Sequence, residues 1–193
     1  MHDLNDVVCR QVKLTKDLFG LERRSPRPAY EAALEERDKL TRPSRAARVR
    51  WLKQKLPSGG LGMPGDTWFV FSEARSTFVE GYFVATVVLS AAFAEHWMIG
   101  QLEVRGFAKD ARTGLAGCVR CARRECLWSD FLLDRVDYLR TIRNPFVHLK
   151  EMGHEHSLTG RSWTRKIATE ELAEGDAKHS LETIFALVQT GPR

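Results

Sequence analysis

The sequence has 193 residues, of which 43% are apolar and 28% are charged, and its net charge is +5. This length provides one good hydrophobic core with a small appendage, and the composition is that of a soluble globular protein. The apolar run over residues 82–94 is 13 residues long, short of the ~20 needed to cross a bilayer, and the first residues lack a secretory signal pattern. We therefore expect a cytoplasmic protein without a membrane span.

The positive charge is concentrated in the N-terminal third of the chain. Residues 1–65 carry 14 Lys or Arg against 8 Asp or Glu, whereas residues 66–193 carry 16 against 17. Between positions 42 and 55 there is no acid, but there are six cations and a tryptophan: Arg42, Arg45, Arg48, Arg50, Trp51, Lys53 and Lys55. Such a segment suits phosphate backbones, so we predict that it binds RNA together with Lys150. A solvated helix face and a site for an acidic protein partner are the alternatives.

Helical periodicity predicts three helices in this N-terminal third, over residues 4–19, 29–40 and 43–56. Residues 57–66 contain four Gly and two Pro, and they are predicted to form a linker. The linker is the expected domain boundary. Residues 1–65 would form a basic N-terminal helical extension, and residues 66–193 would form a helical domain.

The helical domain is predicted to begin with a long apolar helix. Residues 67–71 fit a short strand or the entry to that helix, and Ser72 suits the N-cap of a helix that runs to about residue 101. Because residues 85–94 are apolar on nearly every face, this should be the central helix of a bundle. Glu95 ends the apolar run. It either pairs with a buried cation, for which Arg143 is the obvious candidate, or lies in water at the bundle rim, which is more usual for a carboxylate.

The rest of the domain is predicted to be helical with one polar loop. Residues 113–126 and 129–144 should form a helical hairpin, and residues 151–166 should form the loop. A last helical region begins at Thr169, and residues 176–189 close the bundle.

The cysteines and histidines are not expected to bind a metal. The sequence contains four cysteines: Cys9, Cys118, Cys121 and Cys126. Cys118 and Cys121 form a CxxC, but a zinc site needs a fourth ligand and usually a second pair. Free thiols that pack in the core or lie on the surface are the simpler interpretation. His154 and His156 lie in the charged loop, where they should be solvated.

The segment over residues 128–150 carries the most informative pattern. An apolar stripe at helical spacing predicts a packed helix face: Trp128, Leu132, Val136 and Leu139. The next position on this stripe is Arg143, where another apolar residue would be expected. Asn144 follows it directly, and His148 comes five residues after Arg143.

A second stripe of this segment is polar: Asp137, Thr141, Asn144 and His148. On one helix, Arg143 and His148 are roughly 140° apart, so they do not meet unless Pro145 bends the helix. Two copies of the chain across a twofold axis offer another way to gather the arginines and histidines into one cleft.

The motif Arg143–Asn144–Pro145–Phe146–Val147–His148 resembles the Arg-x4–6-His signature of HEPN domains. The predicted order of helices in residues 70–190 is also similar to that of the family. This resemblance implies an all-α, HEPN-like bundle of four to five helices, here with an N-terminal helical extension. It also implies an endoribonuclease that works without a metal or cofactor, acts at a homodimer interface and leaves 2′,3′-cyclic phosphates.

The residue types fit this chemistry. His148 can transfer protons near neutral pH, Arg143 can bind the phosphorane oxygens, and Asn144 can orient His148 or a phosphate oxygen. Glu95, Asp137 and Thr141 are predicted to support them. Besides RNA and a second copy, a cognate antitoxin or regulatory protein would be a partner of a toxin- or defence-type enzyme. Lys150 stands where HEPN toxins paired with minimal nucleotidyltransferases have a tyrosine, so silencing by nucleotidylation is not expected.

The alternative is a non-catalytic HEPN-like module for dimerisation and for binding a partner or nucleotide. In that case Arg143, Asn144 and His148 would only cap helix carbonyls and form the hydrogen bonds that a buried loop needs.

Overall fold

The computed structural model describes residues 14–16, 22–24, 27–57, 62–63, 65–151 and 153–192. The chain divides into two compact units between Ala47 and Arg48. Residues 48–57, which were predicted to lie in the N-terminal extension, therefore fall in the second unit.

The first unit contains a short hairpin. Strand β1 (Leu14–Lys16) pairs antiparallel with β2 (Glu22–Arg24), and Thr15 lies opposite Arg23. The helix predicted over residues 4–19 is therefore wrong at residues 14–16, and its other residues lie outside the described ones. Pairing between strands competes with local helix propensity here, and apolar periodicity within one segment does not reveal it.

Helix α2 (Arg27–Lys55) is continuous, although the sequence predicted two helices separated before Pro43. That break is wrong because one proline removes only one backbone donor, and nearby side chains reinforce the same turn. The Thr41 hydroxyl donates to the Arg37 carbonyl at 2.9 Å, and Arg42 and Arg45 both form ion pairs with Asp38.

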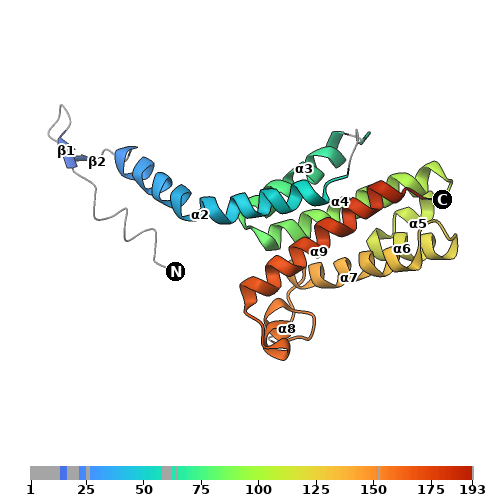
Figure 1. The fold of residues 1–193 in the computed structure, drawn as a ribbon. Helices are drawn as coiled ribbons and strands as arrows, with labels where there is room; N and C mark the ends of the chain where they lie inside the picture. Colours follow the sequence, from blue (N-terminus) through green and yellow to red (C-terminus); the bar gives the residue numbers. More distant parts are fainter. Residues whose placement is uncertain are drawn as a thin grey trace. The chain divides into compact units, whose positions relative to one another are not determined.

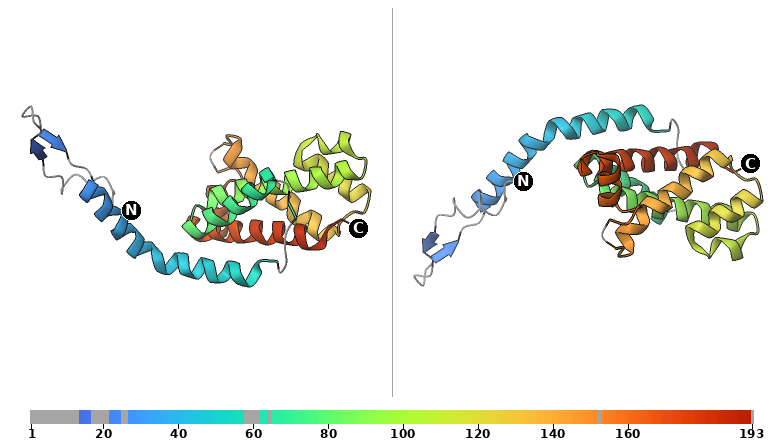
Figure 2. Two further views of the ribbon diagram at one scale, coloured as in Figure 1. Left: turned by 90° about the horizontal axis from the view of Figure 1, so that it is seen from above. Right: turned by 90° about the horizontal axis from the view of Figure 1, so that it is seen from below.

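The second unit is an all-α bundle, as predicted. Its further helices are α3 (Gly65–Glu80), α4 (Phe83–Val104), α5 (Ala108–Ala111), α6 (Gly114–Arg124), α7 (Asp130–Val147), α8 (Leu158–Arg165) and α9 (Thr169–Thr190). Helix α4 is central, since it contacts α3, α5, α6, α7 and α9 (Figure 1). The long red helix in Figure 2 is α9, which packs along α4 and α7. Phe71, Phe93, Met98, Leu139 and Ile184 are fully buried in the core between these helices.

Helices α3 and α4 replace the single helix predicted over residues 72–101. Gly81 separates them with a φ of +85°, a conformation that glycine adopts without strain. The N–H of Tyr82 donates to the Thr77 carbonyl at 2.8 Å, and that of Gly81 donates to the Phe78 carbonyl at 3.1 Å. This is the bonding pattern of a glycine-terminated helix. Ser72, the predicted N-cap, consequently lies inside α3.

Helix α4, with 22 residues, is long and apolar enough to cross a membrane by length and composition alone. It is longer than the apolar run seen in the sequence because the helix continues past Glu95. In the structure its residues Val87, Ala91, Ala94 and Met98 are buried in the bundle core, as expected for the central helix of a helical domain.

Helix α8 was predicted to be part of a loop. Ser157 caps its start, since its hydroxyl accepts from the Gly160 N–H at 3.0 Å, and Lys166 ends it in the left-handed conformation. The loop prediction over residues 151–166 is therefore wrong for its second half. The glycines and charged residues of this segment are typical of a loop. Its second half nevertheless forms a two-turn helix, because the N-cap Ser157 accepts a hydrogen bond from the first turn.

Candidate functional site at the end of α7

Arg143 lies near the end of α7 and forms an ion pair with Glu95 of α4. Its Nη2 is 3.6 Å from the Glu95 Oε2, and the two side chains are 21% and 29% exposed. Of the two arrangements open to Glu95 from the sequence, the structure therefore has the pair with Arg143. A Cβ built on Gly114 would lie 3.9 Å from the Glu95 Oε1, which places this carboxylate beside the start of α6. Three helices thus meet at one half-buried ion pair.

Cys118 lies on the α6 side of this meeting point. Burial and, to a smaller extent, the nearby negative charge of Glu95 raise the pKa of its thiol to about 11. Cys118 and Cys121 are both buried in the core, whereas Cys126 is exposed, and all three are free thiols. A thiol with so high a pKa is protonated at neutral pH, so Cys118 is a packing residue and not a nucleophile.

Asn144 and His148 complete the predicted site. The Nη1 of Arg143 lies 3.5 Å from the Asn144 Oδ1, and the backbone N–H of His148 donates to the Asn144 carbonyl at 2.9 Å. Helix α7 continues through Pro145 to Val147, and His148 leaves it with extended backbone angles (φ −131°, ψ 119°). The imidazole of His148 is exposed. Within the described residues it makes no hydrogen bond or ion pair, either with Arg143 or with any other side chain.

Two of the predicted supporting residues act within α7 itself. The Asp137 carboxylate accepts from the Arg140 Nε at 2.8 Å, and the Thr141 hydroxyl donates to the Asp137 backbone carbonyl at 2.9 Å. Neither interaction reaches Arg143. Of the predicted supporting residues, Glu95 is the one that the fold brings to the arginine.

The surface beside His148 is apolar. Val147 and Leu149, which flank it, are 43% and 101% exposed. Exposed apolar groups next to polar ones are typical of a surface that another molecule covers.

The predicted RNA-binding cations are largely engaged within the chain. In the first unit, Arg42 and Arg45 share the carboxylate of Asp38. In the second unit, the Arg48 Nε donates to the Val79 carbonyl at 2.8 Å, and its guanidinium lies 5.6 Å from the centre of the Phe83 ring.

The remaining predicted RNA-binding residues fall into two groups. Trp51 packs on Phe78, with ring centres 5.0 Å apart, and Lys55 forms an ion pair with Glu182 at 2.8 Å. The other three are exposed and form no ion pair in the part of the chain that the structure describes: Arg50, Lys53 and Lys150.

A buried ion pair between α8 and α9 was not predicted. The Arg161 guanidinium donates to both carboxylate oxygens of Asp176, at 2.9 and 2.5 Å, and the side chains are only 6% and 5% exposed. Arg161 also donates to the His156 carbonyl at 3.3 Å and to the Tyr138 hydroxyl at 3.5 Å. Arg161 therefore fixes α8, and the turn before it, to α7 and α9. The N-cap signal at Ser157 could have revealed the helix, but no local signal pairs two residues fifteen positions apart.

His179 lies next to this ion pair on α9. Its ring packs edge-on against Tyr138 with centres 4.9 Å apart, and its Nε2 is buried without a hydrogen-bond partner among the described residues. Burial lowers the pKa of His179, and the charge of Arg135 lowers it further, which outweighs the opposite effect of the Asp176 and Glu182 carboxylates. The imidazole is therefore neutral in the folded protein near pH 7.

We expect His179 to make the fold less stable in mild acid. Because its pKa is lower in the folded than in the unfolded state, the unfolded chain binds more protons as the pH falls below about 6.5, and the free energy of unfolding then decreases. His179→Phe keeps a ring against Tyr138 but cannot titrate. Urea unfolding at about pH 7.5 and about pH 5.5 should therefore show a smaller loss of stability for this variant than for the wild type. Equal losses in the two proteins would contradict the assignment.

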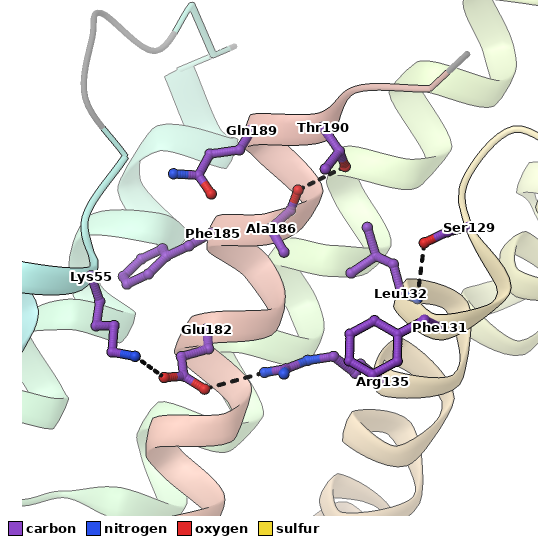
Figure 3. Close-up of a pocket in the computed structure, with 10 residues that line it drawn as sticks. All are labelled: Lys55, Ser129, Phe131, Leu132, Arg135, Glu182, Phe185, Ala186, Gln189 and Thr190. Carbon is purple, nitrogen blue, oxygen red and sulfur yellow. Dashed lines mark hydrogen bonds and ion pairs between the residues drawn. The ribbon is translucent and has the colours of Figure 1, made fainter.

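A groove between α7, α9 and the end of α2 is a second site that the sequence did not reveal (Figure 3). It has a volume of about 430 Å³ and an apolar wall that includes Phe131, Leu132 and Phe185. Its charges are already paired, since Glu182 binds Lys55 at 2.8 Å and Arg135 at 3.4 Å. The groove therefore offers fewer free polar groups for chemistry than the end of α7.

Within the described residues, no three His, Cys, Asp or Glu side chains are grouped so that they could hold a metal ion. Comparison with known proteins gives no significant match to a protein-family model, a curated protein or a solved structure.

Proposed function

We propose that the protein is a metal-independent endoribonuclease of the HEPN type, with its site at the end of α7. The observation that carries this proposal is the position of Arg143. It is held by Glu95 at 3.6 Å and lies five residues before an exposed imidazole, that of His148. The order of α4, α6, α7 and α9 along the chain supports the proposal, because the resemblance led us to expect a long apolar helix, a middle helix, the helix with the motif and a closing helix.

The guanidinium retains binding capacity in this arrangement. Arg143 has five N–H donors, and the contacts with Glu95 and Asn144 occupy only part of them. On this proposal Glu95 orients the planar guanidinium of Arg143, and the remaining N–H donors of that group bind the phosphate of the RNA. A fixed, permanently charged group of this kind stabilises the negative charge that develops on the phosphorane oxygens.

The imidazole of His148 would perform the proton transfers. The 2′-hydroxyl loses its proton to a base while its oxygen forms a bond to phosphorus. The bond from phosphorus to the 5′-oxygen then breaks, and that oxygen takes a proton from an acid. The products are a 2′,3′-cyclic phosphate and a 5′-hydroxyl.

Two copies of the chain are proposed to form the complete site. One chain leaves Arg143 and His148 without a mutual contact, and a twofold axis at the end of α7 would supply the second histidine for the second proton transfer. The exposed Val147 and Leu149 are the apolar surface that the second copy would cover. Lys150, which is exposed two residues after His148, would then contact the RNA backbone.

The Glu95–Arg143 pair is also the observation that favours the alternative, a non-catalytic module for dimerisation and for binding a partner or nucleotide. In that case the pair would only join α4 to α7. The two functions differ in what the loss of Arg143 does.

Arg143→Ala is expected to lower the rate of RNA cleavage by about 10²–10³-fold, because it removes a fixed donor to the transition state. The melting temperature and oligomeric state should stay close to those of the wild type, since a half-exposed ion pair contributes at most about 1 kcal/mol. Arg140→Ala, one turn earlier on α7, is the matched control and should retain activity. A variant that loses stability or assembly without any change in cleavage would support the non-catalytic module instead.

A further inference from the structure

A groove between the end of α2 and helix α3 combines aliphatic side chains with two cations. Its volume is about 360 Å³, which is within the usual size of a small-molecule site. Four residues from the end of α2 and four from α3 line it: Val49, Leu52, Lys53, Leu56, Arg75, Ser76, Val79 and Glu80. All of them belong to the second unit, and none lies at the end of α7.

Arg75 is a half-buried cation in this groove. Its guanidinium lies 5.2 Å from the centre of the buried Phe71 ring, and burial lowers the pKa of Arg75. In the part of the chain that the structure describes, no carboxylate or carbonyl accepts a hydrogen bond from it. A cation that is partly removed from water is normally paired, and the face of one phenyl ring offsets only part of that cost. An anion in the groove would supply the missing partner.

Lys53 lies at the same end of the groove as Arg75. The contacts between α2 and α3 are those of an antiparallel pair: Arg48 with Val79 and Phe83, and Trp51 with Phe78. Later residues of α2 therefore lie beside earlier residues of α3, which brings Lys53 level with Arg75 and leaves Glu80 at the opposite end. Lys53 is exposed and forms no ion pair among the described residues. The end of the groove at Lys53 and Arg75 is thus positively charged.

We propose that this groove binds a ligand with a single carboxylate on a short aliphatic chain, such as a medium-chain fatty acid. Arg75 and Lys53 bind the carboxylate, because a guanidinium can donate to both of its oxygens and an ammonium adds a second charge. The aliphatic chain lies over the buried Leu52 toward Val49 and Val79. These walls are aliphatic, so they provide no aromatic face on which a nucleobase could stack.

The length and the charge of the groove set the size of the ligand. Val49 and Leu56 are seven residues apart, which corresponds to roughly 10 Å along the helix axis, so the aliphatic chain is short. The two cations and Glu80 give the lining a net charge of one positive unit, which matches one carboxylate. Binding does not depend on RNA cleavage, since the groove shares no residue with the end of α7.

Isothermal titration of the full-length chain with octanoate, without RNA, tests the proposal. Octanoate should bind saturably to a single site per chain. Acetate lacks the aliphatic chain and octanol lacks the charge, so each should bind about tenfold or more weaker than octanoate. Octanoate should also raise the melting temperature of the chain, because a ligand that binds only the folded state stabilises it.

Two variants locate the site. Arg75→Gln removes the charge but keeps a polar side chain, and it should weaken octanoate binding about tenfold. Its melting temperature without octanoate should stay close to that of the wild type, since Arg75 has no ion pair among the described residues to lose. Arg50→Gln removes an exposed cation of α2 that does not line the groove, so this matched control should bind octanoate as the wild type does.

Three results would overturn the proposal. They are the absence of saturable octanoate binding to the wild type, an equal affinity for octanol, and equal losses of affinity in Arg75→Gln and Arg50→Gln.

Discussion

Asp176→Asn is expected to lower the free energy of unfolding by about 3–5 kcal/mol. The substitution leaves the Arg161 guanidinium, which is only 6% exposed, without its carboxylate. A buried charge that has lost its partner retains the full penalty of removal from water, which is why breaking such a pair is more damaging than never having had it. Urea denaturation at neutral pH measures the loss.

Two variants separate this mechanism from a general effect on α9. Glu174→Gln breaks an exposed ion pair on the same helix, in which Lys178 lies 2.7 Å from the carboxylate, and it should cost at most about 1 kcal/mol. Replacing both buried partners, by Arg161→Met with Asp176→Leu, should recover part of the loss because no charge remains buried. A loss for Asp176→Asn no larger than that for Glu174→Gln would contradict the account.

His148→Ala is expected to lower the rate of RNA cleavage by about 10²–10⁴-fold, the usual contribution of a general acid or base. The side chain is exposed, so the melting temperature should not change. His156→Ala, an exposed histidine in the turn before α8, is the matched control and should retain the wild-type rate. If both variants cleave RNA as fast as the wild type, the activity belongs to another site or to a contaminant.

The strongest apolar patterns predicted the bundle correctly. The stripe from Trp128 to Leu139 gave α7, and the run from residue 85 to 94 gave the central helix α4. The Glu95–Arg143 pair could be proposed because each residue interrupts an apolar stripe. Its formation could not be decided, because a carboxylate at the end of an apolar run is as well satisfied by water until the neighbouring helix is placed.

Local breaks were harder to predict than helices. Pro43 was expected to end a helix, yet the neighbouring Thr41 hydroxyl bonds the backbone and the helix continues. Gly81 does end one, although glycine is common inside helices too. The two turns differ in their hydrogen bonds: a side chain bonds the backbone before Pro43, whereas backbone N–H groups after α3 bond its last carbonyls at Gly81. A propensity scale contains neither kind of bond.

The basic segment shows the limit of counting charges. Residues 42–55 contain no acid, yet Arg42 and Arg45 pair with Asp38 just outside this window, and Lys55 pairs with Glu182 on the last helix. An excess of cations in the sequence therefore overstates the positive charge that is free to bind phosphate. The buried Arg161–Asp176 pair could not be predicted for a related reason: the two residues are fifteen positions apart, and only the folded chain shows which charges meet.

The central claim is that the end of α7 cleaves RNA without a metal, and the ends of the RNA products test it most directly. Purified protein should be incubated with mixed RNA in EDTA, and the termini should be identified by mass spectrometry. The account predicts 2′,3′-cyclic phosphates and 5′-hydroxyls, and their loss in His148→Ala. Intact RNA under varied conditions, or 3′-hydroxyl and 5′-phosphate ends that appear only with a divalent cation, would contradict it.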